Sequence, residues 1–180
     1  MIDRADRPAF IAGIVVVGLA LLMTAKGAWW SAKHIERLRP PQTGAAAPAF
    51  SLNTPDGKPI ALGALRGQVV LLDFWATWCG ACRKKMPQLE RLHRELEQRG
   101  LRILAINVEG NAERTAAYLK QRKSPLTALV DDGTVARHYG VQVLPHLVLI
   151  DRQGKTVDVQ VGQGGDTRLR KRIEVLLAAR

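Results

Sequence analysis

The sequence predicts an α/β domain with a mixed central sheet, and three observations support this. From residue 68 onward, short apolar segments alternate with segments of helical period. The first apolar segments are nearly continuous, which is typical of strands covered on both faces. The last two are joined by the turn Asp151-Arg152-Gln153-Gly154, so part of the sheet is expected to be antiparallel. Strands that alternate with helices and end in a hairpin describe a helix-covered mixed sheet.

The chain begins with a segment that resembles a membrane anchor rather than part of this domain. Residues 8–25, PAFIAGIVVVGLALLMTA, carry no charge, and as a helix they would be about 27 Å long, close to the hydrocarbon thickness of a bilayer. Trp29 and Trp30 follow, where aromatic residues lie at the membrane interface. We therefore predict a tail at 1–7 and a transmembrane anchor at 8–30. A cleaved signal peptide is the alternative, although Lys26 interrupts any cleavage site close to the apolar run.

A spacer and a short hairpin separate this anchor from the rest of the chain. Residues 31–46 form a predicted linker that ends in the Pro/Ala-rich segment RPPQTGAA, and the domain is expected over 47–180. Two short apolar segments flank Pro55-Asp56-Gly57, which predicts an N-terminal hairpin. With only two cysteines in the chain, the domain must depend on a hydrophobic core.

The remaining elements follow from hydrophobic periodicity. Strands are predicted at 68–76, 101–109 and 126–132, and within the segment 144–162 on both sides of the last turn. Between them we expect helices over 80–99, 112–122 and 134–140. The helix that Gly100 ends has an apolar stripe, and in the second helix Ala116 and Leu119 should face inward. Asp166 or Thr167 can cap a final helix. The stripe residues are Met86, Leu89, Leu92 and Leu96 in the first helix, and Leu169, Ile173, Leu176 and Leu177 in the last.

The distribution of the basic residues, rather than the net charge itself, bears on whether the chain binds nucleic acid. The net charge is +11, but the basic residues are dispersed over several predicted helices and do not alternate with aromatic residues. We therefore expect a solvated basic surface and no nucleic-acid partner. The four histidines are scattered and lack ligand spacing, so we expect no metal site: His34, His93, His138 and His146.

Cys79 and Cys82 form the one motif with a clear chemical meaning. A helix that opens at residue 79 or 80 places the first sulfur at its N-terminus, where free N–H groups and the helix dipole stabilise a thiolate. The second sulfur lies within one turn, so Cys79 can attack a disulfide and Cys82 can resolve the mixed disulfide. Three basic residues follow and add positive potential: Arg83, Lys84 and Lys85. A zinc site would require further ligands, and an idle pair of thiols is the remaining alternative.

The segment FWATWCGACRKKMP resembles the active-site segment of the thioredoxin superfamily. With the anchor, the hairpin, and an extra helix and strand, the chain is similar to membrane-anchored TlpA-like thiol-disulfide oxidoreductases, also known as redoxin-domain proteins. The resemblance implies a thioredoxin-like fold over 47–180. In YGVQVLPHLVLIDRQGK it makes Pro145 the cis-proline that faces the dithiol, and Pro87 the proline within the active-site helix.

The resemblance also implies roles for individual residues. Asp73 occupies the position of the buried aspartate of thioredoxins, where many TlpA-like proteins have asparagine. A buried carboxyl group has a raised pKa and can accept the proton of Cys82; the alternative is an aspartate that reaches solvent at a strand edge. The predicted catalytic residues are therefore Cys79, Cys82 and Asp73. The predicted substrate-binding residues are Trp78, Gly80, Leu144, Pro145 and His146.

Three positions depart from the family pattern. Ala81 replaces the proline of a CxPC motif, and Lys85 replaces a common glutamate, which should make the rim of the site more basic. His146 replaces the usual threonine after the cis-proline. A protonated His146 could stabilise the Cys79 thiolate, or the residue could contact substrate or only pack.

Together these features predict a membrane-tethered thiol-disulfide oxidoreductase without a cofactor other than its dithiol. The resemblance implies disulfide-containing client proteins such as apocytochrome c, and a membrane thiol-electron carrier that reduces the dithiol again. The anchor would lie in the lipid of the cytoplasmic membrane. A redox-inactive binding or sensor module and a thiol peroxidase are the alternatives; for the latter, Thr77 is present but the Pro-x-x-x-Thr-x-x-Cys spacing is not.

Two arguments disagree on the side of the membrane on which the domain lies. More basic residues follow the apolar run than precede it, which by the positive-inside rule would keep the domain in the cytoplasm. A large C-terminal domain can nevertheless be translocated, and a tethered dithiol is most useful in an oxidising compartment. We therefore expect an extracytoplasmic, periplasmic domain.

Overall fold

The computed structural model describes residues 23, 42–164 and 166–179. The predicted tail, nearly all of the anchor at 8–30 and most of the linker lie outside the described residues. Within the part of the chain that is described, no helix combines the length and the apolar character needed to cross a bilayer.

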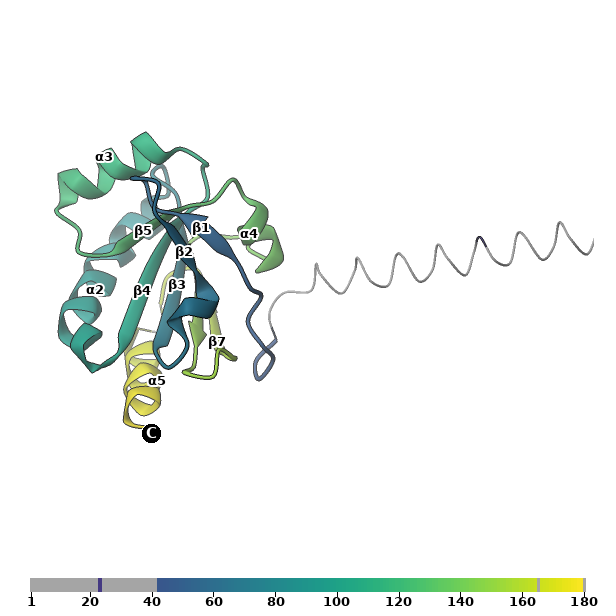
Figure 1. The fold of residues 1–180 in the computed structure, drawn as a ribbon. Coiled ribbons are helices and arrows are strands. Elements are labelled where there is room, and N and C mark those ends of the chain that lie inside the picture. Colours follow the sequence, from purple (N-terminus) through teal and green to yellow (C-terminus); the bar gives the residue numbers. More distant parts are fainter. Residues whose placement is uncertain (1–22, 24–41, 165, 180) are drawn as a thin grey trace, which may run out of the picture. The chain divides into compact units, whose positions relative to one another are not determined.

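The domain is built on one seven-stranded mixed sheet with the order β2-β1-β5-β4-β3-β6-β7 (Figure 1). Strands β3 and β4 are parallel, as are β4 and β5, while β6 runs antiparallel to β3 on its other side and β7 antiparallel to β6. The strands are β1 (Ser51–Asn53), β2 (Pro59–Ala61), β3 (Val69–Trp75), β4 (Leu101–Asn107), β5 (Thr127–Val130), β6 (His146–Ile150) and β7 (Thr156–Val161). The mixed sheet with helices is the predicted fold class.

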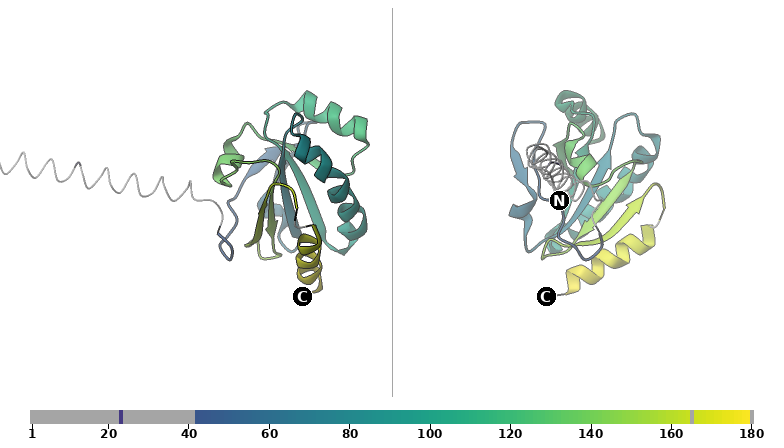
Figure 2. Two further views of the ribbon diagram at one scale, coloured as in Figure 1. Left: turned by 180° about the vertical axis from the view of Figure 1, so that it is seen from behind. Right: turned by 90° about the vertical axis from the view of Figure 1, so that its right-hand side faces the viewer.

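Helices cover both faces of this sheet, which explains why β3 is apolar at nearly every position. Helices α2 (Gly80–Leu96), α3 (Ala112–Arg122) and α5 (Asp166–Ala178) pack on one face, and α4 (Thr134–His138) packs on the other (Figure 2). Side chains of β3 alternate between the two sides. Val69, Leu71 and Trp75 contribute to the core beneath α2, and Val70 and Phe74 contribute to the core beneath α4.

The helices form where the apolar spacing predicts them, with one error in orientation. All four predicted stripe residues of α2 are buried, and a short 3-10 helix, η2 (Glu97–Arg99), leads from α2 to Gly100 in the left-handed conformation. In α3, Thr115 and Leu119 are buried, but Ala116 is exposed. The prediction that Ala116 faces inward was therefore wrong, because the inward face is the one defined by the (i, i+4) pair Thr115 and Leu119.

The N-terminal part of the described chain pairs with the sheet at both of its edges. Strands β1 and β2 pair as an antiparallel hairpin around Pro55-Asp56-Gly57 and are followed by the 3-10 helix η1 (Leu62–Leu65). The Gly44 N–H donates to the Thr156 carbonyl at 2.8 Å, and Ala46 bridges to Lys155. The folded domain thus includes residues 44–46, which were predicted to belong to the linker.

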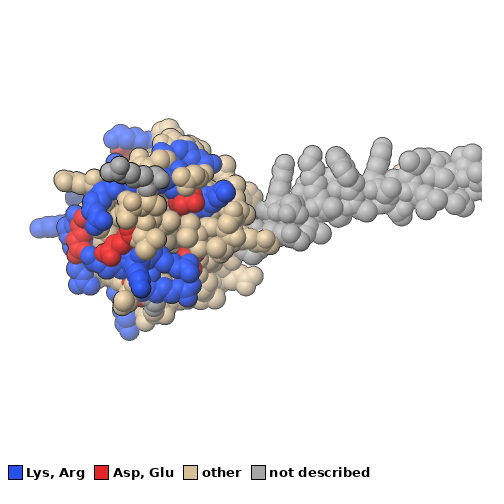
Figure 3. Space-filling model, turned by 90° about the horizontal axis from the view of Figure 1, so that it is seen from below, with Lys and Arg blue, Asp and Glu red and all other residues tan. Residues whose placement is uncertain are grey.

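Basic side chains are dispersed over the surface with acidic ones between them. Viewed from below, blue and red side chains are interspersed on one face of the domain (Figure 3). On α5, Arg170 contacts Glu95 at 2.7 Å and Glu174 at 2.9 Å, and Arg172 contacts Asp158 at 3.0 Å. Such pairs of opposite charge at the surface are typical of a solvated surface.

Candidate functional site

The dithiol lies at the start of α2, immediately after the carboxyl end of β3. Cys79 is the N-cap residue of α2, and its sulfur accepts a hydrogen bond from the Cys82 N–H at 3.1 Å. Cys79 and Cys82 are bonded to each other as a disulfide. A sulfur that accepts a backbone N–H at a helix N-terminus is placed to be stabilised as a thiolate after reduction.

The two sulfurs differ in their surroundings. Cys79 lines a groove of about 400 Å³, together with Trp78, Leu144 and side chains of the β5–α4 region. Both cysteines are largely buried, with 6% of Cys79 and 2% of Cys82 exposed, but Cys82 lies on the face of α2 that packs against the sheet and does not border the groove. The geometry therefore makes Cys79 the sulfur that a partner can reach, and Cys82 the sulfur that acts from beneath.

The turn that carries Trp78 and Cys79 is held by Glu109, a residue that sequence analysis did not single out. The Thr77 N–H donates to one oxygen of Glu109 at 2.6 Å, and the Thr77 hydroxyl donates to the other at 3.0 Å. Asn107 and Arg114 donate to the same carboxylate at 3.0 Å and 3.3 Å. Burial opposes the charge of Glu109, but these hydrogen bonds outweigh it and lower the pKa of the carboxyl group.

A signal for Glu109 was present in the sequence. It follows β4, and β4 is the parallel neighbour of β3, so residues just after the two strands meet at one edge of the sheet. An acidic residue at the carboxyl end of one buried strand and a dithiol just after the preceding strand are expected to lie close together when the two strands are parallel neighbours. The Val108 N–H bond to the Trp75 carbonyl, at 3.1 Å, fixes this approach.

Asp73 lies in the middle of β3 and points to the same side of the sheet as α2. Only 2% of the residue is exposed, and its Oδ1 atom has no hydrogen-bond partner among the described residues. Burial raises the pKa of Asp73 to about 7, and the positive charge of Lys85 opposes part of this shift. The alternative of a solvent-exposed aspartate at a strand edge is thus contradicted, because β4 and β6 flank β3 on both sides.

Lys85 does not belong to the basic rim in which it was predicted to lie. The residue is 5% exposed, its Nζ atom donates to the Gly164 carbonyl at 3.0 Å, and it forms an ion pair with Asp166. Lys85 lies three residues after Cys82 and therefore on the same, inward side of α2. Arg83 and Lys84 are exposed, as expected for a rim.

Two of the predicted substrate-binding residues, Trp78 and Leu144, line the groove. Trp78 is 70% exposed beside Cys79, and a Cβ atom at Gly80 would meet only the Arg83 guanidinium, at 3.9 Å. The Leu144–Pro145 peptide bond is cis, as the resemblance implied. Leu144 lines the groove, and the described residues provide no hydrogen-bond partner for its N–H or carbonyl group.

His146 is the member of this set that lies apart from the groove. It is 4% exposed, pairs with Phe74 in β3, and makes an edge contact with the Phe74 ring at a centroid distance of 6.1 Å. Because it is in register with Phe74, it points to the opposite side of the sheet from Asp73. Burial lowers the pKa of His146, and neither ring nitrogen has a partner among the described residues. These observations favour a neutral packing residue over an imidazolium that supports Cys79.

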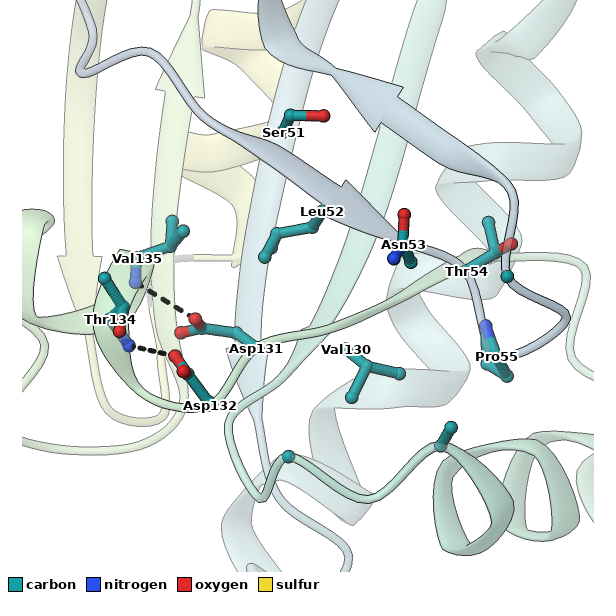
Figure 4. Close-up of a pocket in the computed structure, with 13 residues that line it drawn as sticks. Ser51, Leu52, Asn53, Thr54, Pro55, Val130, Asp131, Asp132, Thr134 and Val135 are labelled. Carbon is teal, nitrogen blue, oxygen red and sulfur yellow. Dashed lines mark hydrogen bonds between the residues drawn. The ribbon is translucent and has the colours of Figure 1, made fainter.

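A second cavity, of about 590 Å³, lies between the N-terminal hairpin and the β5–α4 loop (Figure 4). Its acidic side chains already have structural partners. Asp131 accepts the N–H groups of Val135 and Ala136, and Asp132 accepts the N–H of Thr134. These carboxylates cap the short helix α4.

Comparison with known proteins agrees with this geometry. Residues 43–159 match the AhpC/TSA family. A thiol-disulfide oxidoreductase ResA of Bacillus cereus is 34% identical over 123 residues, which are 68% of this chain and 71% of that protein. ResA of Bacillus subtilis is 34% identical over 66% of this chain and 67% of its own length.

Solved structures share the fold as well as part of the sequence. The crystal structure of a thiol:disulfide interchange protein DsbE from Chlorobium tepidum superposes with a TM-score of 0.72 and 32% identity, over 77% of this chain and 99% of that one. A protein disulfide isomerase from Bacteroides thetaiotaomicron has a TM-score of 0.70 and 29% identity, over 76% and 91% of the two chains.

The chain belongs to the AhpC/TSA family. Within this family its relatives are ResA-like and TlpA-like proteins, and the Cys79–Cys82 pair on a thioredoxin-like fold makes the chain a thiol-disulfide oxidoreductase. The thiol peroxidase alternative depended on Thr77 acting beside a lone cysteine. In this AhpC/TSA-family protein the Thr77 hydroxyl is bound to Glu109, and Cys79 has a bonded partner.

Proposed function

We propose that the protein is a membrane-tethered reductase of disulfides in client proteins outside the cytoplasmic membrane. The observation that carries this proposal is the unequal placement of the two sulfurs. Cys79 faces a groove that can receive a peptide, and Cys82 lies beneath it on the side of Asp73. An accessible attacking sulfur above a shielded resolving sulfur is the arrangement that a disulfide-exchange cycle requires.

The cycle starts from the reduced pair. The Cys79 thiolate attacks one sulfur of the client disulfide, the client S–S bond breaks, and the first client sulfur leaves as a thiolate. Cys82 then loses its proton and attacks Cys79, and the second client sulfur leaves with the electron pair of the mixed disulfide. The client gains two electrons and two protons, and Cys79–Cys82 returns to the disulfide state. A dithiol donor must supply two electrons for the next turn.

Asp73 is the base in this scheme. A carboxyl group with a pKa of about 7 is about half ionised near neutral pH, which is the range in which general-base catalysis is most effective. Trp78 and Leu144 would bound the client chain in the groove, with the backbone of Leu144 available to an extended peptide beside Pro145. Gly80 has no side chain of its own, which lets a client backbone approach the disulfide closely on that side.

The identity of the client and donor is a proposal that rests on the family resemblance. The clients would include apocytochrome c before haem attachment, and the donor would be a membrane thiol-electron carrier. The uncharged segment at 8–25 would hold the domain at the membrane through an inner-membrane helix.

Trapping of the mixed disulfide tests the proposed cycle. Cys82→Ser should accumulate covalent complexes with clients through Cys79, and Cys79→Ser should accumulate none. Equal trapping by both variants would contradict the assignment of the two sulfurs. The midpoint potential of the Cys79–Cys82 couple tests the direction. A reductase needs a dithiol couple that is more reducing than the disulfide of its client. A midpoint potential of about −120 mV, typical of strong oxidants, would show that the protein is an oxidase and not a reductase.

A further inference from the structure

Lys85 is a buried cation in the active-site helix with one acidic partner in contact among the described residues. Its ammonium group is bound by Asp166, at the start of α5, and by the Gly164 carbonyl in the β7–α5 connection. The Asp166 side chain is about half exposed, whereas that of Lys85 is almost fully buried. A buried charge in this position needs compensation, and Asp166 provides it.

The position of Lys85 in the helix relates it to the dithiol. Cys82, Lys85 and Met86 form the (i, i+3, i+4) set on the inward side of α2, over β3. Asp73 extends from β3 toward the same side, and its neighbours in register are the uncharged Ala105 in β4 and Leu147 in β6. The positive charge of Lys85 acts on Asp73 in the direction that favours the carboxylate.

Among the described residues, Lys85 of α2 is the charged group that acts on Asp73, and Asp166 of α5 is its partner. Glu90 and His93 are also buried on α2, but they lie farther along the helix and contact Arg122 and Glu97. His146 points to the other side of the sheet, and Lys84 is exposed to solvent. The Gln163 side chain also donates to the Ala81 carbonyl at 3.4 Å, so the β7–α5 connection contacts the first turn of α2 between the cysteines as well.

We propose that the buried Lys85–Asp166 pair controls the charge of Asp73, and through it the step in which Cys82 releases the client. This inference rests on the proposed function for the role of Asp73 as a base. Lys85 is a positioning residue here, since it touches neither client nor sulfur. In the release step, the Cys82 proton passes to the Asp73 carboxylate, the new thiolate bonds to the Cys79 sulfur, and the bond from Cys79 to the client breaks.

Two variants separate this electrostatic role from a structural one. Lys85→Met and Asp166→Asn break the same ion pair, but they change the charge near Asp73 in opposite directions. Lys85→Met removes a cation, so Asp73 should ionise at higher pH. Asp166→Asn removes an anion and leaves Lys85 unpaired, so Asp73 should ionise at lower pH. If the ion pair has only a structural role, the pH midpoint of release should shift in the same direction in both variants, or should not shift.

The measurement is stopped-flow reaction of the reduced full-length protein, in detergent, with a chromogenic aromatic disulfide. The first coloured thiol reports attack by Cys79, and the second reports release by Cys82. We expect the midpoint of the second phase to move up by about one pH unit in Lys85→Met, which means about tenfold slower release at acidic pH, and to move down in Asp166→Asn. The first phase should keep its pH dependence. Lys171→Met, an exposed lysine of α5, is the matched control and should leave both phases unchanged.

The outcomes distinguish this proposal from the proposed function. In one outcome, Asp73→Asn slows release, but the midpoints of Lys85→Met and Asp166→Asn shift in the same direction or not at all. This outcome would overturn the role of Lys85 and keep that of Asp73. If Asp73→Asn leaves release unchanged, the base role is wrong. The pH dependence of unfolding then still reports the charge of Asp73. For the pair to control Asp73, the loss of stability with rising pH must continue to about one pH unit higher in Lys85→Met than in the parent.

Discussion

Asp73 and His146 are buried polar side chains in neighbouring strands, and burial favours the neutral form of each. For Asp73 this raises the pKa to about 7, and for His146 it lowers the pKa. The two residues differ in their partners: Lys85 acts on Asp73, whereas His146 packs against Phe74 on the other side of the sheet. Of the two, only Asp73 is therefore poised to change its charge near neutral pH beneath the dithiol.

The first prediction concerns the kinetics of Asp73→Asn. Without a carboxylate to accept the Cys82 proton, release of the mixed disulfide should slow by roughly 10- to 100-fold near pH 7, the usual contribution of a general base. The attack by Cys79 should change less, because its sulfur is supported by the Cys82 N–H and the helix N-terminus. Single-turnover kinetics with a client peptide checks both steps. An unchanged release rate would mean that water deprotonates Cys82.

The same substitution should stabilise the oxidised protein at high pH. The raised pKa means that the folded state retains the Asp73 proton between about pH 4 and 7, whereas the unfolded state releases it, so the parent loses stability as pH rises through this range. Asp73→Asn removes this loss. Its advantage in the free energy of unfolding should grow from near zero at about pH 4 to about 4 kcal/mol above about pH 7. Urea denaturation at a series of pH values measures it, and parallel curves for both proteins would rule out a raised pKa.

A third prediction follows from the neutral, packed state of His146. If its imidazole is uncharged on the α4 side of the sheet, His146→Phe should leave the pH dependence of Cys79 alkylation unchanged, because no positive charge is lost. Iodoacetamide alkylation of the reduced protein between about pH 5 and 9 provides the measurement. A shift of the alkylation profile to higher pH would restore the imidazolium role that the sequence left open.

At the scale of elements, the site is assembled where β3 and β4 end side by side. The turn after β3 carries the dithiol, and Glu109, just after β4, binds the Thr77 backbone and hydroxyl. The cis peptide before Pro145 brings Leu144 to the same groove from the start of β6. The rest of the groove is lined mainly by α4 and the loop between α4 and β6.

Glu109→Ala tests whether this contact between strand ends supports the site. It leaves the Thr77 N–H and the Asn107 amide without their acceptor, so we expect a loss of about 1–3 kcal/mol in the free energy of unfolding, together with slower attack by Cys79. Arg114→Ala is the control. It removes a donor to the same carboxylate whose side chain is 62% exposed, and it should cost less than about 1 kcal/mol. Equal effects of the two variants in denaturation and single-turnover assays would show that the Thr77 contact has no special role.

At the scale of the whole molecule, the sequence was informative wherever periodicity or a local motif determines structure. The order of strands and helices, the buried stripe of α2 and the position of the dithiol all depend on neighbours in the chain. Residues whose environment is created by distant segments were misjudged or missed. Lys85 looked like part of a basic rim, but Asp166, 81 positions later, supplies its partner. Glu109 and the packed state of His146 likewise depend on which strands are adjacent in the sheet.

The last prediction concerns the membrane, on which two features of the sequence disagree. An uncharged segment at 8–25 is long enough to span a bilayer, but the basic residues after it outnumber those before it. We expect the domain to be exported, because a reducing dithiol serves clients that acquire disulfides, and these are found outside the cytoplasm. A reporter that is active only outside the cytoplasm, fused after Arg180, should be active and should remain with the membrane fraction at full length. Deletion of residues 8–25 should abolish both properties. Activity of a cytoplasmic reporter alone would place the domain inside the cell and would show that the flanking charges decide its orientation.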